Sequence, residues 1–170
     1  QSVQVMGVYV RDQDEALEFY VGKLGMRVHT DVRNGNYRWL TVQHADQLSF
    51  QLGLFAPGPP MHDAATAESV RAIVAKGAMP PLVLSVDDCR AEHARLRALG
   101  VEFTQEPVER YGNVDAGFRD PSGNGWKMIE AVRRVTRLPF DAHLMIAEPG
   151  RWADRFLGAG CDSITFHVEV

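Results

Sequence analysis

The chain contains one pattern twice, and this internal repeat restricts the available folds more than any other feature. In the first copy, a strand-like stretch from Val8 to Asp12 is followed by a helical pattern that ends at Leu24-Gly25. In the second copy, the stretch from Leu84 to Asp88 is followed by a helical pattern that ends at Leu99-Gly100. Asp88 lies 76 residues after Asp12. The repeat predicts two structural modules of the same design.

Each module is predicted to contain one helix and four strands. Asp12 and Glu15 have the spacing of a capping box at a helix start. A glycine such as Gly25 supplies the left-handed conformation that ends a helix. Apolar residues alternate with period two in the segments that follow, which is typical of half-buried antiparallel strands. These segments are 36–42 and 48–54 in the first module, and 115–119 and 126–130, joined by a turn at 120–124, in the second. The fold class is α+β, with two βαβββ modules.

Composition excludes several classes of protein. Of the 170 residues, 45% are apolar and 24% are charged, as in ordinary globular proteins. No apolar run is long enough to span a membrane, and a net charge of −4 without a basic patch argues against nucleic acid as a partner. Cys89 and Cys161 lack metal-ligand spacing, so they are expected to be free thiols in a reducing compartment, the cytoplasm.

Four motifs together resemble the vicinal oxygen chelate superfamily, which includes glyoxalase I, extradiol dioxygenases and bleomycin-resistance proteins. They are Val10-Arg-Asp12, Phe19-Tyr20 with Leu24-Gly25, Val86-Asp-Asp88, and Phe118-Arg-Asp-Pro-Ser-Gly-Asn124. The resemblance implies a domain over residues 1–131, with modules at about 3–55 and 79–131 and a linker at about 56–78. It further implies that the two sheets curve around a ligand cleft, and that the protein is a homodimer.

Metal-dependent members of this superfamily hold a cation at four positions, one near the start and one on the last strand of each module. Carried over by motif, these positions are Val5, Gln51, Pro81 and Lys127. A divalent cation prefers imidazole nitrogens and carboxylate oxygens, and these four residues provide one neutral amide oxygen and an ammonium group. We therefore expect no metal and no other cofactor, and we assign no catalytic residue.

Without a metal site, the resemblance still implies a cleft, which can bind a small, partly aromatic ligand. By strand alternation Val5 and Tyr9 share one face of the first sheet. The predicted ligand-binding residues are Val5, Tyr9, Gln51, Ser85, Tyr111 and Lys127. Alternative interpretations stay open for several of them: Tyr9 also suits a core position and Lys127 also suits a solvent-facing one. Trp39 and Trp126 are interpreted as packing residues.

The character of the sequence changes near residue 132. Apolar segments at 138–146 and 162–170 flank a helical segment at 148–156, which predicts a βαβ unit with two buried parallel strands. The runs Asp141-Ala-His-Leu-Met-Ile146 and Phe166-His-Val-Glu169 resemble an internal fragment of ribulose-phosphate 3-epimerase, a TIM barrel. His143 matches a metal-ligand position of that family, but its partner ligands have no counterpart here, so epimerase activity is not expected.

Three functions follow from these observations. The first is a metal-free protein that binds a small molecule in the cleft between the modules. The second is a metal-dependent lyase or dioxygenase of the same superfamily. The third is a natural or engineered chimera whose tail, residues 132–170, drives oligomerisation, because a segment shorter than ~40 residues rarely folds without a partner surface.

Overall fold

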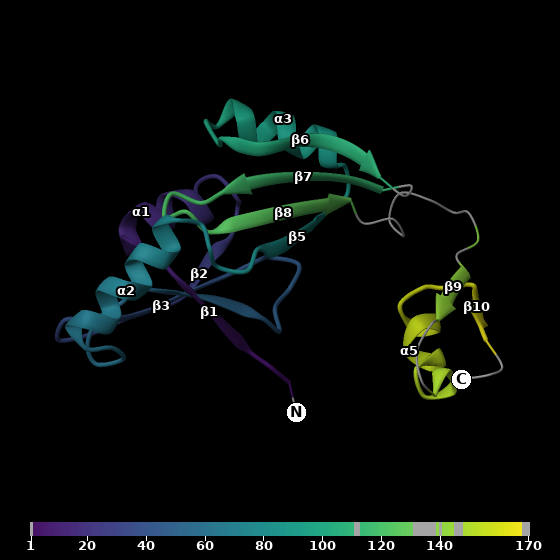
Figure 1. Cartoon of the computed structure of the whole chain (residues 1–170), viewed down its shortest axis with the longest axis horizontal. Helices are drawn as coiled ribbons and strands as arrows, with labels where there is room; N and C mark the ends of the chain where they lie inside the picture. Colours follow the sequence, from purple (N-terminus) through teal and green to yellow (C-terminus); the bar gives the residue numbers. More distant parts are fainter. Residues whose placement is uncertain (1, 111–112, 131–138, 140, 145–147, 168–170) are drawn as a thin grey trace. The chain divides into compact units, whose positions relative to one another are not determined.

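The chain folds into two compact units, Gln1–Glu130 and Ala131–Val170, which are described separately. The computed structural model describes residues 2–110, 113–130, 139, 141–144 and 148–167 (Figure 1). No helix in these ranges is long and apolar enough to cross a membrane.

The first module has the predicted βαβββ order. Its elements are β1 (Val5–Tyr9), α1 (Gln13–Tyr20), β2 (Arg27–Asn34), β3 (Tyr37–Gln43) and β4 (Gln51–Phe55). The strands form a sheet in the order β1-β4-β3-β2, in which β1 is parallel to β4 and the other pairs are antiparallel. The strand expected at 48–54 begins only at Gln51, because residues 44–50 form turns.

The second module repeats this topology. Its elements are β5 (Leu82–Val86), α3 (Cys89–Ala98), β6 (Phe103–Arg110), β7 (Asn113–Arg119) and β8 (Gly125–Glu130). The sheet order β5-β8-β7-β6 is that of the first sheet, and β5 is again parallel to the last strand (Figure 1). The two βαβββ modules predicted from the repeat are confirmed.

The helix ends follow the predicted chemistry. Asp12 accepts hydrogen bonds from the main-chain nitrogens of Asp14 and Glu15, both at 2.8 Å, and so caps α1. Gly25 and Gly100 have φ values of 73° and 74°, in the left-handed region that glycine tolerates best. α1 nevertheless ends at Tyr20, one turn earlier than its apolar pattern indicates.

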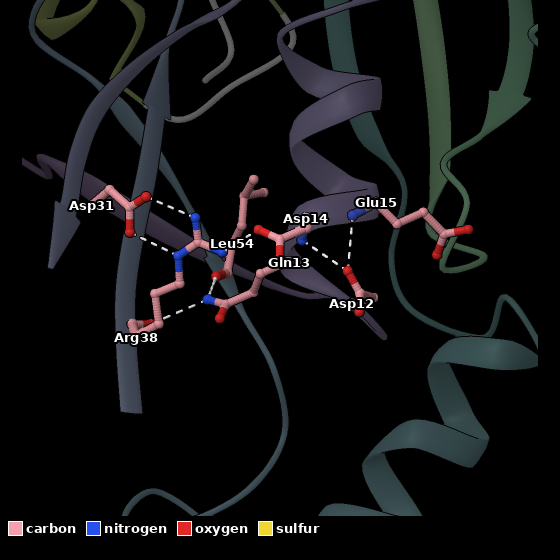
Figure 2. Close-up of polar contacts among 7 residues, drawn as sticks. All are labelled: Asp12, Gln13, Asp14, Glu15, Asp31, Arg38 and Leu54. Carbon is pink, nitrogen blue, oxygen red and sulfur yellow. Dashed lines mark hydrogen bonds and ion pairs between the residues drawn. The ribbon is translucent and has the colours of Figure 1, made fainter. Parts of the chain in front are cut away.

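A buried arginine fastens α1 to the first sheet (Figure 2). The Arg38 side chain, on β3, is only 8% exposed. Its guanidinium donates to both carboxylate oxygens of Asp31 at 2.7 Å and to Asp14 at 2.6 Å. These hydrogen bonds hold the pKa of Asp31 below its usual value. Gln13 adds a second link, since its amide donates to the main-chain oxygens of Arg38 and Leu54.

The two modules share one hydrophobic core, which contains side chains of both sheets and of α1 and α3. Phe19 of α1 packs against Phe118 of β7, with ring centroids 6.2 Å apart. Phe118 in turn stacks on Trp126, which is 5% exposed, so the interpretation of Trp126 as a packing residue is confirmed. Because burial of apolar surface is the main stabilising contribution, neither module is complete alone.

The turn at 120–124 joins the second module to the first through buried hydrogen bonds. The Tyr20 hydroxyl donates to Asp120 Oδ2 at 2.7 Å. The Asn124 amide donates to the main-chain oxygen of Tyr9 at 2.8 Å, and Ser122 Oγ accepts from the main-chain nitrogen of Arg11 at 2.9 Å. Burial, and then the Asp120 charge, raise the pKa of Tyr20 well above its usual value.

Between the modules lies α2 (Ala64–Ala75), which is capped by Asp63. Ala67 and Val74 are its buried residues. The sequence predicts a short helix at 67–76 with Val70, Ile73 and Val74 buried, but Ile73 is 45% exposed, whereas its neighbour Val74 is buried.

The second unit contains β9 (Asp141–Leu144), a 3₁₀ turn at Pro149–Arg151, α5 (Ala153–Gly158) and β10 (Ser163–Phe166). β9 and β10 are parallel, as the βαβ prediction requires. The expectation of two buried strands is wrong for β10 in the single chain, where Phe166 is 48% exposed. Residues 138, 140, 145–146 and 168–170 of the two predicted strands lie outside the described ranges.

Candidate functional site

The first sheet has an open face opposite the helix-covered core. Strand alternation places the side chains of Val5, Gly7 and Tyr9 on this face of β1, while Val8 belongs to the core. In the parallel register Val5 lies beside Gln51, so the structure brings these two predicted residues together.

An aromatic pair covers part of this face. A Cβ atom at Gly53 would lie 2.6 Å from the Phe55 ring, and one at Gly7 would lie 3.1 Å from it. The two glycines therefore make room for the ring to lie along the sheet. Trp39 of β3 packs against Phe55 with ring centroids 5.0 Å apart and is 40% exposed. Trp39 thus packs, as interpreted, but also presents an aromatic surface to solvent.

Polar groups border the aromatic pair. Gln51 Nε2 lies 3.4 Å from His29 Nε2, and His29 Nδ1 lies 2.8 Å from the hydroxyl of Thr30. Val32, on β2 opposite Trp39, is 57% exposed. This surface suits a ligand with a flat apolar part and one hydrogen-bonding group.

The open face of the second sheet carries the other predicted residues. In the register of β5 and β8, Val83 lies beside Lys127 and Ser85 beside Ile129. Val83 is 62% exposed and Ser85 is also exposed. Lys127 and Ser85 are therefore on one face, as predicted.

The Lys127 ammonium group already has partners within the second sheet. Its ammonium group forms an ion pair with Asp115 and donates to Gln105 Oε1 at 2.9 Å. Gln105 also donates to Asp115 Oδ2 at 2.9 Å, which closes a three-residue network. Gly117 lies between Gln105 and Lys127 in the sheet and has no side chain to separate them. Hydrogen bonds from Lys127, and then from Gln105, lower the pKa of Asp115.

The other predicted residues lie apart from these groups. The Tyr9 hydroxyl is 2.8 Å from His62 Nε2, so this tyrosine is held by the loop before α2. Tyr111 lies outside the described residues. His143 lies on β9 in the second unit, with its ring centroid 5.1 Å from that of His167.

The residues at the superfamily's cation positions do not fit a divalent metal. Val5 and Pro81 have no ligating atom, and Lys127 carries a positive charge already paired with Asp115. Gln51 contributes one neutral amide. Within the described ranges, no three His, Cys, Asp or Glu side chains are grouped to hold a metal ion.

The fold and these motifs agree with a match to the family model "Glyoxalase/Bleomycin resistance protein/Dioxygenase superfamily" over residues 2–128. The chain belongs to this superfamily. A relative of this chain, the "Uncharacterized protein YurT" of Bacillus subtilis, is 37% identical over 132 residues, which are 78% of this chain and 98% of that protein.

Two solved structures are similar to this chain. The crystal structure of UcmS2 is 40% identical, with a TM-score of 0.73, and the match covers 77% of this chain and 98% of UcmS2. TnmS3, described as an antibiotic binding protein from Streptomyces sp. CB03234, is 29% identical with a TM-score of 0.61, and the match covers 76% of this chain and 95% of TnmS3.

The C-terminal part of the chain is similar to a different family. The family model "Ribulose-phosphate 3 epimerase family" matches residues 95–170, which includes residues 95–130 at the end of the first unit. The epimerase of Mycobacterium tuberculosis H37Rv is 32% identical over 90 residues, 53% of this chain and 37% of that enzyme. The Bacillus subtilis epimerase is 52% identical over 43 residues, 25% of this chain and 20% of that enzyme. The matches therefore span little more than a third of an epimerase, in agreement with an epimerase-like fragment.

Proposed function

We propose that the first unit binds a small molecule with a planar aromatic part, without using a metal. The observation that carries this proposal is the Trp39–Phe55 pair, which lies along the sheet over Gly7 and Gly53 with Trp39 still 40% exposed. A planar ligand can stack on such a surface, since aromatic side chains contribute large contact areas at little entropic cost. The description of TnmS3 as an antibiotic binding protein supports the same class of function.

The second sheet would contribute the polar side of the binding region. Lys127, Asp115 and Gln105 are fixed by one another, so they present donors and acceptors in a set geometry. Ser85 adds a hydroxyl on the same face. We further propose that the protein is a homodimer in which a second copy of the chain covers Val32 and Val83 and leaves Trp39 to the ligand, because these two valines leave apolar surface exposed. Sedimentation of the full chain would measure this homodimer.

Ligand binding is tested by calorimetric titration with antibiotics that contain fused aromatic rings and with aminoglycosides, which contain none. We expect the fused-ring compounds to bind and Trp39→Ala to weaken that binding by about tenfold or more, as for an aromatic hot spot. Trp152→Ala is the matched control, because Trp152 is 42% exposed but lies in the second unit. Unchanged affinity in Trp39→Ala, or binding by no fused-ring compound, contradicts the proposal.

Metal independence is tested by incubating the protein with Zn²⁺, Ni²⁺ or Fe²⁺, removing excess ion and measuring bound metal. We expect far less than one ion per chain, because the four cation positions supply one neutral amide and no carboxylate or imidazole. A double variant, Val5→His with Lys127→Glu, introduces one imidazole and one carboxylate at two of the four cation positions and is expected to retain more metal. Stoichiometric binding by the unaltered chain favours the metal-dependent lyase or dioxygenase.

A further inference from the structure

A hollow of about 220 Å³ lies between the end of β1 and one face of α2, within the first unit. The helix face consists of Glu68, Arg71, Ala72 and Ala75, whose spacing places them on one side of α2. Ala72 and Ala75 have short side chains, so the helix leaves space where longer residues would fill it.

The hollow combines an apolar lining with two guanidinium groups. Val10, Pro57 and Val74 contribute apolar surface, and Arg11 and Arg71 contribute positive charge. Arg71 Nη1 donates to the main-chain oxygen of Pro57 at 3.0 Å, which holds its guanidinium at the lining.

Neither arginine is strongly neutralised. Arg71 lies 3.5 Å from Glu68, whose side chain is 78% exposed, and Arg11 pairs with Glu15 on the surface at 2.7 Å, with side chains 64% and 39% exposed. Exposed pairs of this kind contribute little free energy, so a ligand carboxylate can replace a glutamate as partner. Tyr9 and Ser122 also line the hollow.

We propose that this hollow is a second binding site, for a small aromatic carboxylic acid. Its volume is somewhat below the ~300 Å³ at which sites for drug-sized ligands begin, which suits a ligand of one or two rings. The ring system lies against the exposed Ala72 and Ala75, and the carboxylate pairs with Arg71, whose planar fork matches it. The site is distinct from the Trp39–Phe55 surface and does not depend on the function proposed for it.

The test uses the full chain and indole-3-carboxylate as the probe, followed by amide chemical shifts. We expect shifts at Tyr9, Arg11 and Ala72 that saturate with probe concentration. Ala72→Phe fills the hollow and should remove these shifts, whereas Ile73→Phe adds a ring of the same size on an exposed position outside the lining and should retain them.

A charge control separates the carboxylate contact from simple apolar binding. Arg71→Leu should weaken binding of indole-3-carboxylate by about tenfold and leave binding of the neutral indole-3-carboxamide unchanged, because only the acid forms the ion pair. The proposal is overturned if millimolar probe causes no shift in this region, or if Ala72→Phe binds the probe as well as the unaltered chain does. It is also overturned if Arg71→Leu weakens binding of the acid and of the amide equally. Trp39→Ala should leave the probe's affinity unchanged, so failure of this site and failure of the aromatic-face site give different results.

Discussion

Replacing Asp120 by alanine should lower the free energy of unfolding of the first unit by about 4 kcal/mol, since each buried donor left without an acceptor costs about 1–3 kcal/mol. The Asp120 carboxylate is 4% exposed and accepts four hydrogen bonds. The donors are the Tyr20 hydroxyl, the main-chain nitrogens of Ser122 and Asn124, and the Asn124 side-chain amide. Alanine has no carboxylate, so all four donors lose their acceptor at once.

The loss is measured by urea unfolding, monitored by near-ultraviolet circular dichroism, to which Trp126 in the shared core contributes. Tyr20→Phe is the matched control, because it removes one donor and leaves the carboxylate with three. We expect that variant to lose about 2 kcal/mol, because the Tyr20 hydroxyl also accepts a hydrogen bond from Trp126 Nε1 at 3.4 Å. A cost for Asp120→Ala no greater than that for Tyr20→Phe would show that the turn is not what holds the modules together.

Gly123→Ala should destabilise the same unit by about 3 kcal/mol, through backbone strain together with a steric clash. Gly123 has a φ of 106°, which side chains other than hydrogen rarely allow. A Cβ atom there would lie 2.6 Å from the main-chain oxygen of Val74, so the turn or the end of α2 must move. Because the obstacle is backbone, no side-chain rotation relieves it.

Gly35→Ala is the control for this prediction. Gly35 also has a positive φ, 58°, but nothing lies within 4 Å of a Cβ atom there. Its substitution should cost about 1 kcal/mol, the conformational contribution alone. Thermal unfolding of both variants measures the difference, and equal midpoints for the two would contradict the close contact between the turn and α2.

The repeat and its period-two strands were sufficient to predict the βαβββ modules, because both follow from short-range spacing of apolar residues. The structure differs from the prediction at three places, because the spacing of apolar residues does not show which contacts an element makes. Residues 44–50 form turns instead of extending β4, α1 ends at Tyr20, and Ile73 lies on the exposed side of α2. Each depends on what the element packs against, which is decided elsewhere in the chain.

The candidate site was harder to predict. Alternation predicted that Ser85 and Lys127 share a face, because strand geometry fixes the face of a residue. Gln51 was predicted from the resemblance, and the register of β1 and β4 puts it beside Val5. Alternation did not predict that Lys127 pairs with Asp115 and Gln105. That network depends on the register of three strands and on the absence of a side chain at Gly117. A signal was present in the sequence: Gly53 and Gly117 are glycines within strand patterns, which often mark close approach of other groups.

The core shared by the modules bears on how such a chain arose. Phe19 and Phe118, from equivalent halves of the repeat, cover each other. A polypeptide of one module would expose that surface to water, and its most direct remedy would be association with an identical molecule. Gene duplication and fusion would then convert a contact between two ancestral molecules into one within a single chain, after which each half could diverge.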